Sequence, residues 1–237
     1  MFRLLYNDLL DFDKWSDWDY GGFMKDFVYV TKKEKQKVKK ELIDLINLVQ
    51  DEVRKYFTFS YEFIGSDSRN MITYDRKSNI GYDFDVNIRV NDDDDEYEAK
   101  DIRKILKNGF DKYSHLFQYD YCEDSTRVLT IKVKDRKNSR ILHSCDFAVV
   151  YDCDDGRQQY IRFNKNQNSY YWEYQPKGYY QLPERIEWCK QNNLWGDGTG
   201  GVRDRYIEKK NNNTDPNKKS RSIFAETVNE IYNHYLI

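Results

Sequence analysis

The sequence predicts a domain of the α+β class, and three observations carry this prediction. Apolar residues recur every three to four positions over 31–56, which is typical of an amphipathic helix. Apolar and polar residues alternate strictly over 81–90, which is typical of a strand with one buried face. A second helical pattern and two further strand patterns follow along the chain. Helices and strands in this order favour one layered α+β domain.

The composition fits one soluble domain with no general affinity for polyanions. The chain has 237 residues, enough for one domain with a short appendage. Lysine and arginine total 39 against 41 aspartate and glutamate residues, which gives a net charge of −2. This net charge gives the protein no general attraction for nucleic acid or for a membrane surface, so any phosphate binding must come from a local site. The 21 tyrosines and 13 phenylalanines supply apolar area for a core.

The cysteines and the apolar runs indicate the cellular compartment of the protein. The four cysteines show no C-x-x-C spacing, and the start of the chain lacks the pattern of a signal peptide. No run approaches the roughly 20 apolar residues that cross a bilayer. We therefore expect a cytoplasmic protein with reduced cysteines and no membrane contact.

The first elements are an arm and a long helix. Residues 1–30 mix aromatic residues and aspartates around adjacent glycines, so an irregular arm is expected. Thr31 and Glu34 have the spacing of a capping box, which predicts a helix over about 31–56. The apolar stripe of this helix consists of Leu42, Leu45, Ile46, Val49 and Val53.

Two strands come next. The first is expected over 57–64 and ends at Gly65 and Ser66, and the second is the alternating run 81–90. The apolar face of the second strand consists of Phe84, Val86, Ile88 and Val90, and its polar face of Asp83, Asp85, Asn87 and Arg89. The acidic run 91–98 lacks the spaced ligands and mid-loop glycine of a calcium loop, so a solvated turn is favoured there.

The middle of the chain continues with a helix over 99–118 and strands over 126–135 and 141–151, joined by the polar turn 136–140. The segment 152–180 is aromatic and polar. Its tyrosines and Trp172 could stack on nucleobases, but a partly buried sheet or loop is the favoured interpretation.

The end of the chain is expected to be a short helical appendage. Pro183 precedes a short helix to about Gln191, and the glycine-rich loop 196–201 follows no strand, so phosphate binding there is not favoured. Lys209–Ser220 is rich in lysine and asparagine and offers nothing apolar to bury, which predicts a mobile loop. Ser222 can cap a final helix.

Three aspartates in the strands form a candidate metal site. Asp83 and Asp85 project from the same strand face, about 7 Å apart at their Cα atoms. Asp146 is a polar residue at the head of the apolar strand 141–151. Three carboxylates can hold two Mg²⁺ ions, as phosphoryl-transfer chemistry with two metals requires. Upstream, the glycine of Gly65-Ser66 lets a backbone approach phosphate closely, and the serine can donate a hydrogen bond to it.

A glycine-serine turn after one strand, an Asp-x-Asp strand and a later strand aspartate together resemble the polymerase beta superfamily. The pattern is most similar to its cGAS/DncV-like and oligoadenylate synthetase branch, where the turn commonly reads glycine, serine, two variable residues, arginine, glycine and threonine. The matching residues in the turn are Gly65, Ser66 and Arg69. The departures are Asn70 and Met71 in place of glycine and threonine, and Tyr82 in place of a serine. The similarity covers about 35–155.

The resemblance implies a polymerase beta-like nucleotidyltransferase fold, with a mixed β-sheet flanked by helices. On this basis the catalytic domain spans 31–200, and 201–237 holds the mobile loop and the C-terminal helix. The resemblance implies that Asp83, Asp85 and Asp146 are the catalytic residues and bind two Mg²⁺ or Mn²⁺ ions, and that Asp146 helps to deprotonate the acceptor. Binding of the nucleotide falls to Gly65, Ser66 and Arg69.

The implied reaction transfers a nucleoside monophosphate from a nucleoside triphosphate to a hydroxyl or phosphate acceptor and releases pyrophosphate. The acceptor stays open among a nucleotide, RNA, a protein and a small molecule, since fold likeness does not choose among them. A nucleotide acceptor would make the protein a second-messenger synthase. The chain is short for such an enzyme, so a homodimer or a partner protein is expected to complete the acceptor site.

Other interpretations of the same residues stay open. The fold could serve a catalytically silent nucleotide-binding or partner-binding module, although clustered carboxylates without a cation are costly. The same carboxylates could serve a metal-dependent nuclease, which would release no pyrophosphate. Alone, an Asp-x-Asp pair is more often the solvent face of a strand, and Arg69 a surface residue. A zinc site at His143 and Cys145 lacks further paired ligands.

Overall fold

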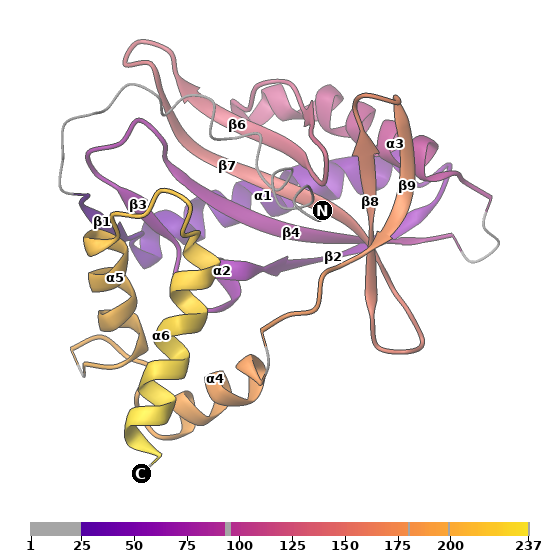
Figure 1. Cartoon of the computed structure of the whole chain (residues 1–237). Helices are drawn as coiled ribbons and strands as arrows, with labels where there is room; N and C mark the ends of the chain where they lie inside the picture. The colour runs from indigo at the N-terminus through magenta and orange to yellow at the C-terminus, as the bar shows by residue number, and fades with distance from the viewer. Residues whose placement is uncertain (1–24, 93–95, 180, 199, 237) are drawn as a thin grey trace.

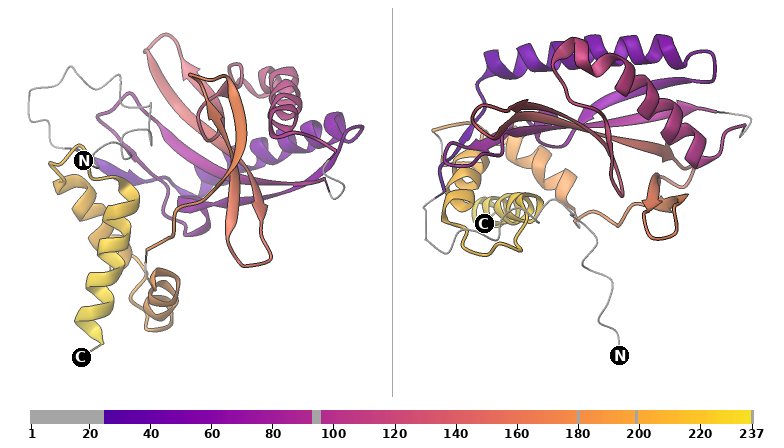
Figure 2. Two further views of the ribbon diagram at one scale, coloured as in Figure 1. Left: turned by 45° about the vertical axis from the view of Figure 1, so that its right-hand side comes forward. Right: turned by 90° about the horizontal axis from the view of Figure 1, so that it is seen from above.

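The computed structural model describes residues 25–92, 96–179, 181–198 and 200–236. The expected N-terminal arm therefore lies outside the described residues up to position 24. A central sheet is covered on one face by two helices, and the C-terminal helices lie beyond its other face (Figure 2). This is the mixed α+β architecture that the sequence predicts.

Helix α1, Lys32–Val53, covers the sheet together with α3, Ala99–Tyr113. The hydroxyl of Thr31 accepts a hydrogen bond from the backbone N–H of Glu34 at 3.3 Å, so the predicted cap is confirmed. The buried face of α1 consists of Val38, Leu42, Leu45, Ile46, Val49 and Val53. The helical pattern continued to 118, but α3 ends at Tyr113 and a 3-10 turn follows over Ser114–Phe117.

The main sheet is mixed. Its central strands run in the order β2, β4, β7, β6 and β5, of which only β4 and β7 pair in parallel. The bounds of these strands are Thr58–Ile64, Tyr82–Asn91, Arg140–Asp152, Leu129–Asp135 and Glu123–Asp124. The segment with α3, β5 and β6 connects β4 to β7, as a parallel pair requires a crossover. In this register Asp83 lies opposite Ser144, and Asp85 lies opposite Asp146.

A hairpin of β8, Gln158–Asn164, and β9, Ser169–Tyr174, continues the sheet from the end of β7. The rings of Phe163 and Tyr170 stack at 4.4 Å between centroids, and Trp172 packs against the main core. The aromatic segment 152–180 thus contributes partly buried sheet, which is the interpretation that the sequence favoured.

Two small elements lie beside β2. A four-residue helical turn, α2, Gly65–Ser68, directly follows β2, and β3, Thr73–Asp75, pairs antiparallel with β1, Phe27–Tyr29. The short pair places the chain after α2 against the C-terminal helices, because α5 contacts β1.

The C-terminal helices have an apolar cluster of their own. They are α4, Leu182–Gln191, α5, Val202–Asn212, and α6, Ser220–Tyr235. Their buried residues include Cys189, Val202, Phe224 and Val228, together with Met71 from the segment after α2. Within the described ranges, no helix is both long and apolar enough to span a bilayer.

The expectation of a mobile loop over Lys209–Ser220 is wrong at its start, because α5 extends to Asn212. Lys209 pairs with Glu226 at 2.6 Å across the two helices. Lys210 is 8% exposed, donates to the hydroxyl of Thr73 at 2.8 Å and lies over the ring of Phe27. A prediction from composition treats each lysine as exposed to solvent, but the alkyl stem of a lysine can be buried when its ammonium group has a partner.

The glycine loop before α5 binds a side chain of the protein itself. The backbone N–H groups of Gly198 and Gly200 donate to the carboxylate of Asp204, at 3.1 and 2.8 Å. These amides are therefore engaged by a side chain of α5, in agreement with the expectation that the loop is not a phosphate cradle.

Candidate functional site

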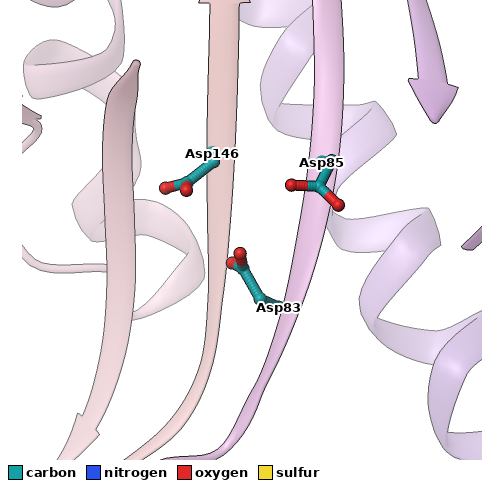
Figure 3. Close-up of side chains that lie close together, drawn as sticks. All are labelled: Asp83, Asp85 and Asp146. Carbon is teal, nitrogen blue, oxygen red and sulfur yellow. The ribbon is translucent and has the colours of Figure 1, made fainter. Parts of the chain in front are cut away.

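Three aspartates from the two parallel strands meet on the face of the sheet opposite α1 and α3 (Figure 3). Asp83 and Asp85 come from β4, and Asp146 comes from β7. One carboxylate oxygen of each lies within 4.8 Å of the others. Among the described residues, this is the one group of three or more acidic, histidine or cysteine side chains with such spacing. The predicted convergence of the three carboxylates is therefore confirmed.

The neighbourhood makes negative charge costly at all three positions. Burial, followed by repulsion from Asp146 and Asp85, raises the pKa of Asp83 well above its usual range. Burial also raises the pKa of Asp85, although the nearby Arg69 guanidinium lowers it. Burial raises the pKa of Asp146 to about 6. A cluster of this kind gains from any cation that it binds.

Two hydroxyl groups hold members of the cluster. Ser144 donates to Oδ1 of Asp83 at 2.8 Å, and Thr130 donates to Oδ1 of Asp146 at 2.5 Å. Behind them, Lys132 forms an ion pair with Glu123 at 2.6 Å, and its charge lowers the pKa of both Asp83 and Asp146. Sequence reasoning missed Thr130 and Ser144, because a hydroxyl residue within a strand gives no local signal of its partner.

Gly65 lies directly against the cluster. Its φ of +64° is in the left-handed region, and a Cβ built on it would lie 2.3 Å from Oδ2 of Asp85. No residue with a side chain fits there while Asp85 keeps its position. Gly65 and the half-buried Ser66 begin α2, so the turn that the sequence singled out adjoins the carboxylates.

The turn is fixed to α1 by a buried ion pair that sequence reasoning also missed. The side chain of Asp67 is 1% exposed and lies 2.6 Å from the ammonium of Lys39 and 3.3 Å from that of Lys35. Lysines in a lysine-rich helix carry no sequence signal of a partner in a distant turn. The two pairs tie α2 to α1, and the first residue of α2, Gly65, lies against Asp85.

Arg69 lies between the cluster and the C-terminal helices. Its guanidinium lies over the ring of Phe224 in α6, at 4.4 Å from the centroid. Burial lowers its pKa, and the carboxylate of Asp85 counteracts this effect. Arg69 is therefore half-buried beside the site, whereas an arginine considered alone is more often exposed.

Solved structures with this architecture are known, although no family model and no curated protein sequence matches the chain. The DncV cyclic AMP-GMP synthase of Vibrio cholerae, in complex with a linear intermediate, superposes with a TM-score of 0.58 at 11% sequence identity. The match covers 87% of this chain and 68% of DncV. The 3′-deoxy ATP bound form of DncV gives a TM-score of 0.50 at 14% identity, over 85% and 52% of the two chains.

The chain has the fold of the cGAS/DncV-like nucleotidyltransferases. At these identities the likeness shows the fold alone. A weaker match, to CdnG of Bradyrhizobium diazoefficiens in complex with GTP, has a TM-score of 0.47 at 9% identity and covers 70% of this chain and 49% of CdnG. The chain thus spans about half to two thirds of the length of these proteins.

Within this fold, the structure brings together five of the residues that the sequence singled out for the site. The carboxylates of Asp83, Asp85 and Asp146 form a common cluster, Gly65 touches it, and Arg69 is attracted to it electrostatically. The predicted fold is therefore confirmed, and the roles of these residues are addressed below.

Proposed function

We propose that the protein is a metal-dependent nucleotidyltransferase. It transfers a nucleoside monophosphate from a nucleoside triphosphate to a hydroxyl or phosphate acceptor and releases pyrophosphate. The observation that carries the proposal is the contact between a left-handed glycine turn and three converging carboxylates, at Gly65 and Asp85. Anionic oxygens that bind cations and a turn that admits phosphate are thereby adjacent.

The carboxylates fit Mg²⁺ or Mn²⁺. Both ions prefer oxygen ligands, and Mg²⁺ binds them at about 2.1 Å. One oxygen of each carboxylate lies within 4.8 Å of the others, which is close enough for the three residues to hold metal ions together. We assign Asp83, Asp85 and Asp146 as the ligands of two ions. Bound there, the ions supply positive charge to the transferred phosphoryl group and the leaving pyrophosphate.

The residues of the chain do the positioning and the proton transfer. Ser66 and the backbone N–H groups of α2 donate hydrogen bonds to the triphosphate, and Arg69 adds positive charge beside it. The acceptor oxygen attacks the α-phosphorus in line, and the bond to the bridging oxygen of the β-phosphate breaks. Asp146, whose pKa of about 6 leaves it ionised at neutral pH, takes the proton of an acceptor hydroxyl.

The proposal includes the setting of the reaction. The acceptor is a nucleotide, RNA, a protein side chain or a small molecule, and the reaction occurs in the cytoplasm. A nucleotide acceptor would make the protein a second-messenger synthase, as DncV is a cyclic AMP-GMP synthase. The match covers 68% of DncV, and we propose that a second copy or a partner protein completes the acceptor site.

The test is incubation of the protein with each α-labelled nucleoside triphosphate and Mg²⁺ or Mn²⁺, with the other nucleotides, RNA or the protein itself as acceptor. The matched control is the double variant Asp83→Asn and Asp85→Asn, which keeps the size of both side chains. We expect pyrophosphate and one labelled product from the parent and neither from the double variant. Chromatography and a protein gel identify the acceptor class.

Three other outcomes contradict the proposal, each in a different way. Stabilisation of the parent by metal and nucleotide without pyrophosphate would indicate a silent binding module. Cleavage of RNA or DNA without pyrophosphate would indicate a nuclease. Equal pyrophosphate release by the parent and the double variant would place the chemistry elsewhere in the chain.

A further inference from the structure

Two of the three aspartates of the cluster, Asp146 and Asp83, each accept a hydrogen bond from a hydroxyl on the neighbouring strand. Thr130 on β6 lies directly opposite Asp146 on β7, and Ser144 on β7 lies directly opposite Asp83 on β4. Their hydroxyls donate to Oδ1 of the facing aspartate, at 2.5 and 2.8 Å. Both bonds join cross-strand pairs, so the sheet itself sets their geometry.

The two bonds lean the same way across the sheet. Asp146 reaches from β7 toward β6, and Asp83 reaches from β4 toward β7, as Figure 3 shows. Asp85 is placed differently, because its carboxylate lies against Gly65. Each of the three side chains therefore has its own contact: Asp146 and Asp83 each accept a hydrogen bond from a hydroxyl, and Asp85 packs against Gly65.

A hydroxyl at position 130 needs a specific explanation. Thr130 is 1% exposed and stands between Leu129 and Ile131 in β6, where valine would fill the same volume. A buried hydroxyl without a partner is costly, and here the partner is a carboxylate of the cluster. The bond occupies one oxygen of Asp146 and fixes its side-chain rotamer, which leaves the second oxygen to act as a ligand.

We propose that Thr130 and Ser144 are positioning residues that orient Asp146 and Asp83 for metal binding. This inference rests on the proposed function, because it assumes that the cluster binds Mg²⁺ or Mn²⁺. Thr130 has the larger effect of the two. It is fully buried, whereas Ser144 is half-buried, so water replaces the hydroxyl of Ser144 more easily.

The test measures Mn²⁺ affinity without nucleotide, from the electron paramagnetic resonance signal of the free ion, in Thr130→Val, Thr130→Ser and Ser144→Ala. We expect Thr130→Val to weaken the affinity about tenfold or more, the usual loss when a partner of a metal ligand is removed. Thr130→Ser keeps a hydroxyl and restores the affinity to near that of the parent. Ser144→Ala weakens it by less than Thr130→Val.

Kinetics give a second reading of the same variants. Thr130→Val should lower kcat and leave the KM for the nucleoside triphosphate near that of the parent, since the triphosphate turn is untouched. A loss of overall folding in Thr130→Val would instead lower its melting temperature as well as its kcat. Ser144→Ala, at a half-buried position, tests the inference independently if Thr130→Val folds poorly.

The possible outcomes distinguish failure of this inference from failure of the proposed function. If the parent binds Mn²⁺ and both Thr130→Val and Ser144→Ala bind it equally well, the hydroxyls only satisfy local hydrogen bonds and the inference is overturned. If the parent binds no Mn²⁺, the metal site fails, and the inference fails with it. If the parent binds Mn²⁺ but transfers no nucleotide, only the proposed function fails, and the affinities still decide the role of Thr130.

Discussion

Replacement of Asp146 by asparagine should make the metal-free protein more stable, by an amount that depends on pH. Its pKa is raised from an ordinary 3.8 to about 6, so the ionised form is disfavoured in the folded state. At 1.36 kcal/mol per pKa unit, this difference of about 2.2 corresponds to roughly 3 kcal/mol at most. The folded state loses this stability as the pH rises from about 4 through about 6. Asparagine does not ionise, and it can still accept the hydrogen bond from Thr130.

The assay is thermal melting of the parent and of Asp146→Asn between pH 4 and pH 8 in a chelator, then at pH 8 with Mg²⁺ and a nucleoside triphosphate. Without metal, the two melting temperatures should be similar near pH 4. The variant should melt higher by up to roughly 6–12 °C at pH 8, since 1 kcal/mol shifts a domain of this size by about 2–4 °C. With Mg²⁺ and nucleotide, only the parent should gain stability, by about 2.7 kcal/mol at a ligand concentration of 100 Kd.

The reasoning is refuted if the advantage of Asp146→Asn is the same at pH 4 and pH 8. It is also refuted if Mg²⁺ with nucleotide stabilises the parent and the variant equally. The first result would mean that the charge of Asp146 does not destabilise the folded protein, and the second that Asp146 does not contribute to metal binding.

Three further predictions concern other parts of the structure. The double change of Asp83 and Asp85 to asparagine should abolish pyrophosphate release without unfolding the protein, as circular dichroism and a phosphate assay would show. Gly65→Ala should abolish nucleotide-dependent stabilisation in a thermal melt, because its Cβ would lie 2.3 Å from Asp85. Gly196→Ala serves as the control, because a Cβ added there would meet no other atom within 4 Å. Burial lowers the pKa of Lys210 from 10.5 to about 8, so its charge lowers the stability of the fold as the pH falls from about 10.5 through about 8. In urea at pH 7, Lys210→Met should therefore be at least as stable as the parent. At pH 10 the stability of the variant relative to that of the parent should be lower than at pH 7.

Local patterns were enough to predict the elements that carry the cluster. Strict alternation over 81–90 matches β4, Tyr82–Asn91, and the apolar run 141–151 matches β7, Arg140–Asp152. A side chain in a strand points to one of only two faces, so the polar face of β4 followed directly from the alternation. The capping pair at Thr31 likewise located the start of α1.

Contacts between distant segments could not be predicted in the same way. The hydroxyl of Thr130 reaches Asp146 only because β6 and β7 pair in one particular register, which no local pattern reveals. Asp67 occupies a variable position of the glycine-serine turn, and its burial depends on lysines about thirty positions earlier. Helix α5 was missed because its lysines resemble those of a solvated loop, while their partners lie in β3 and α6.

The burial of Met71 among the C-terminal helices decides where this chain can be divided. Met71 follows α2 by a few residues, yet it is 2% exposed and packs with α4, α5 and α6. In addition, Arg203 of α5 donates to the backbone carbonyl of Asn70. A fragment that stops after β9 would leave this methionine in water and the end of the turn without its support. For expression and for crystallisation, the sheet and the C-terminal helices should therefore be kept together.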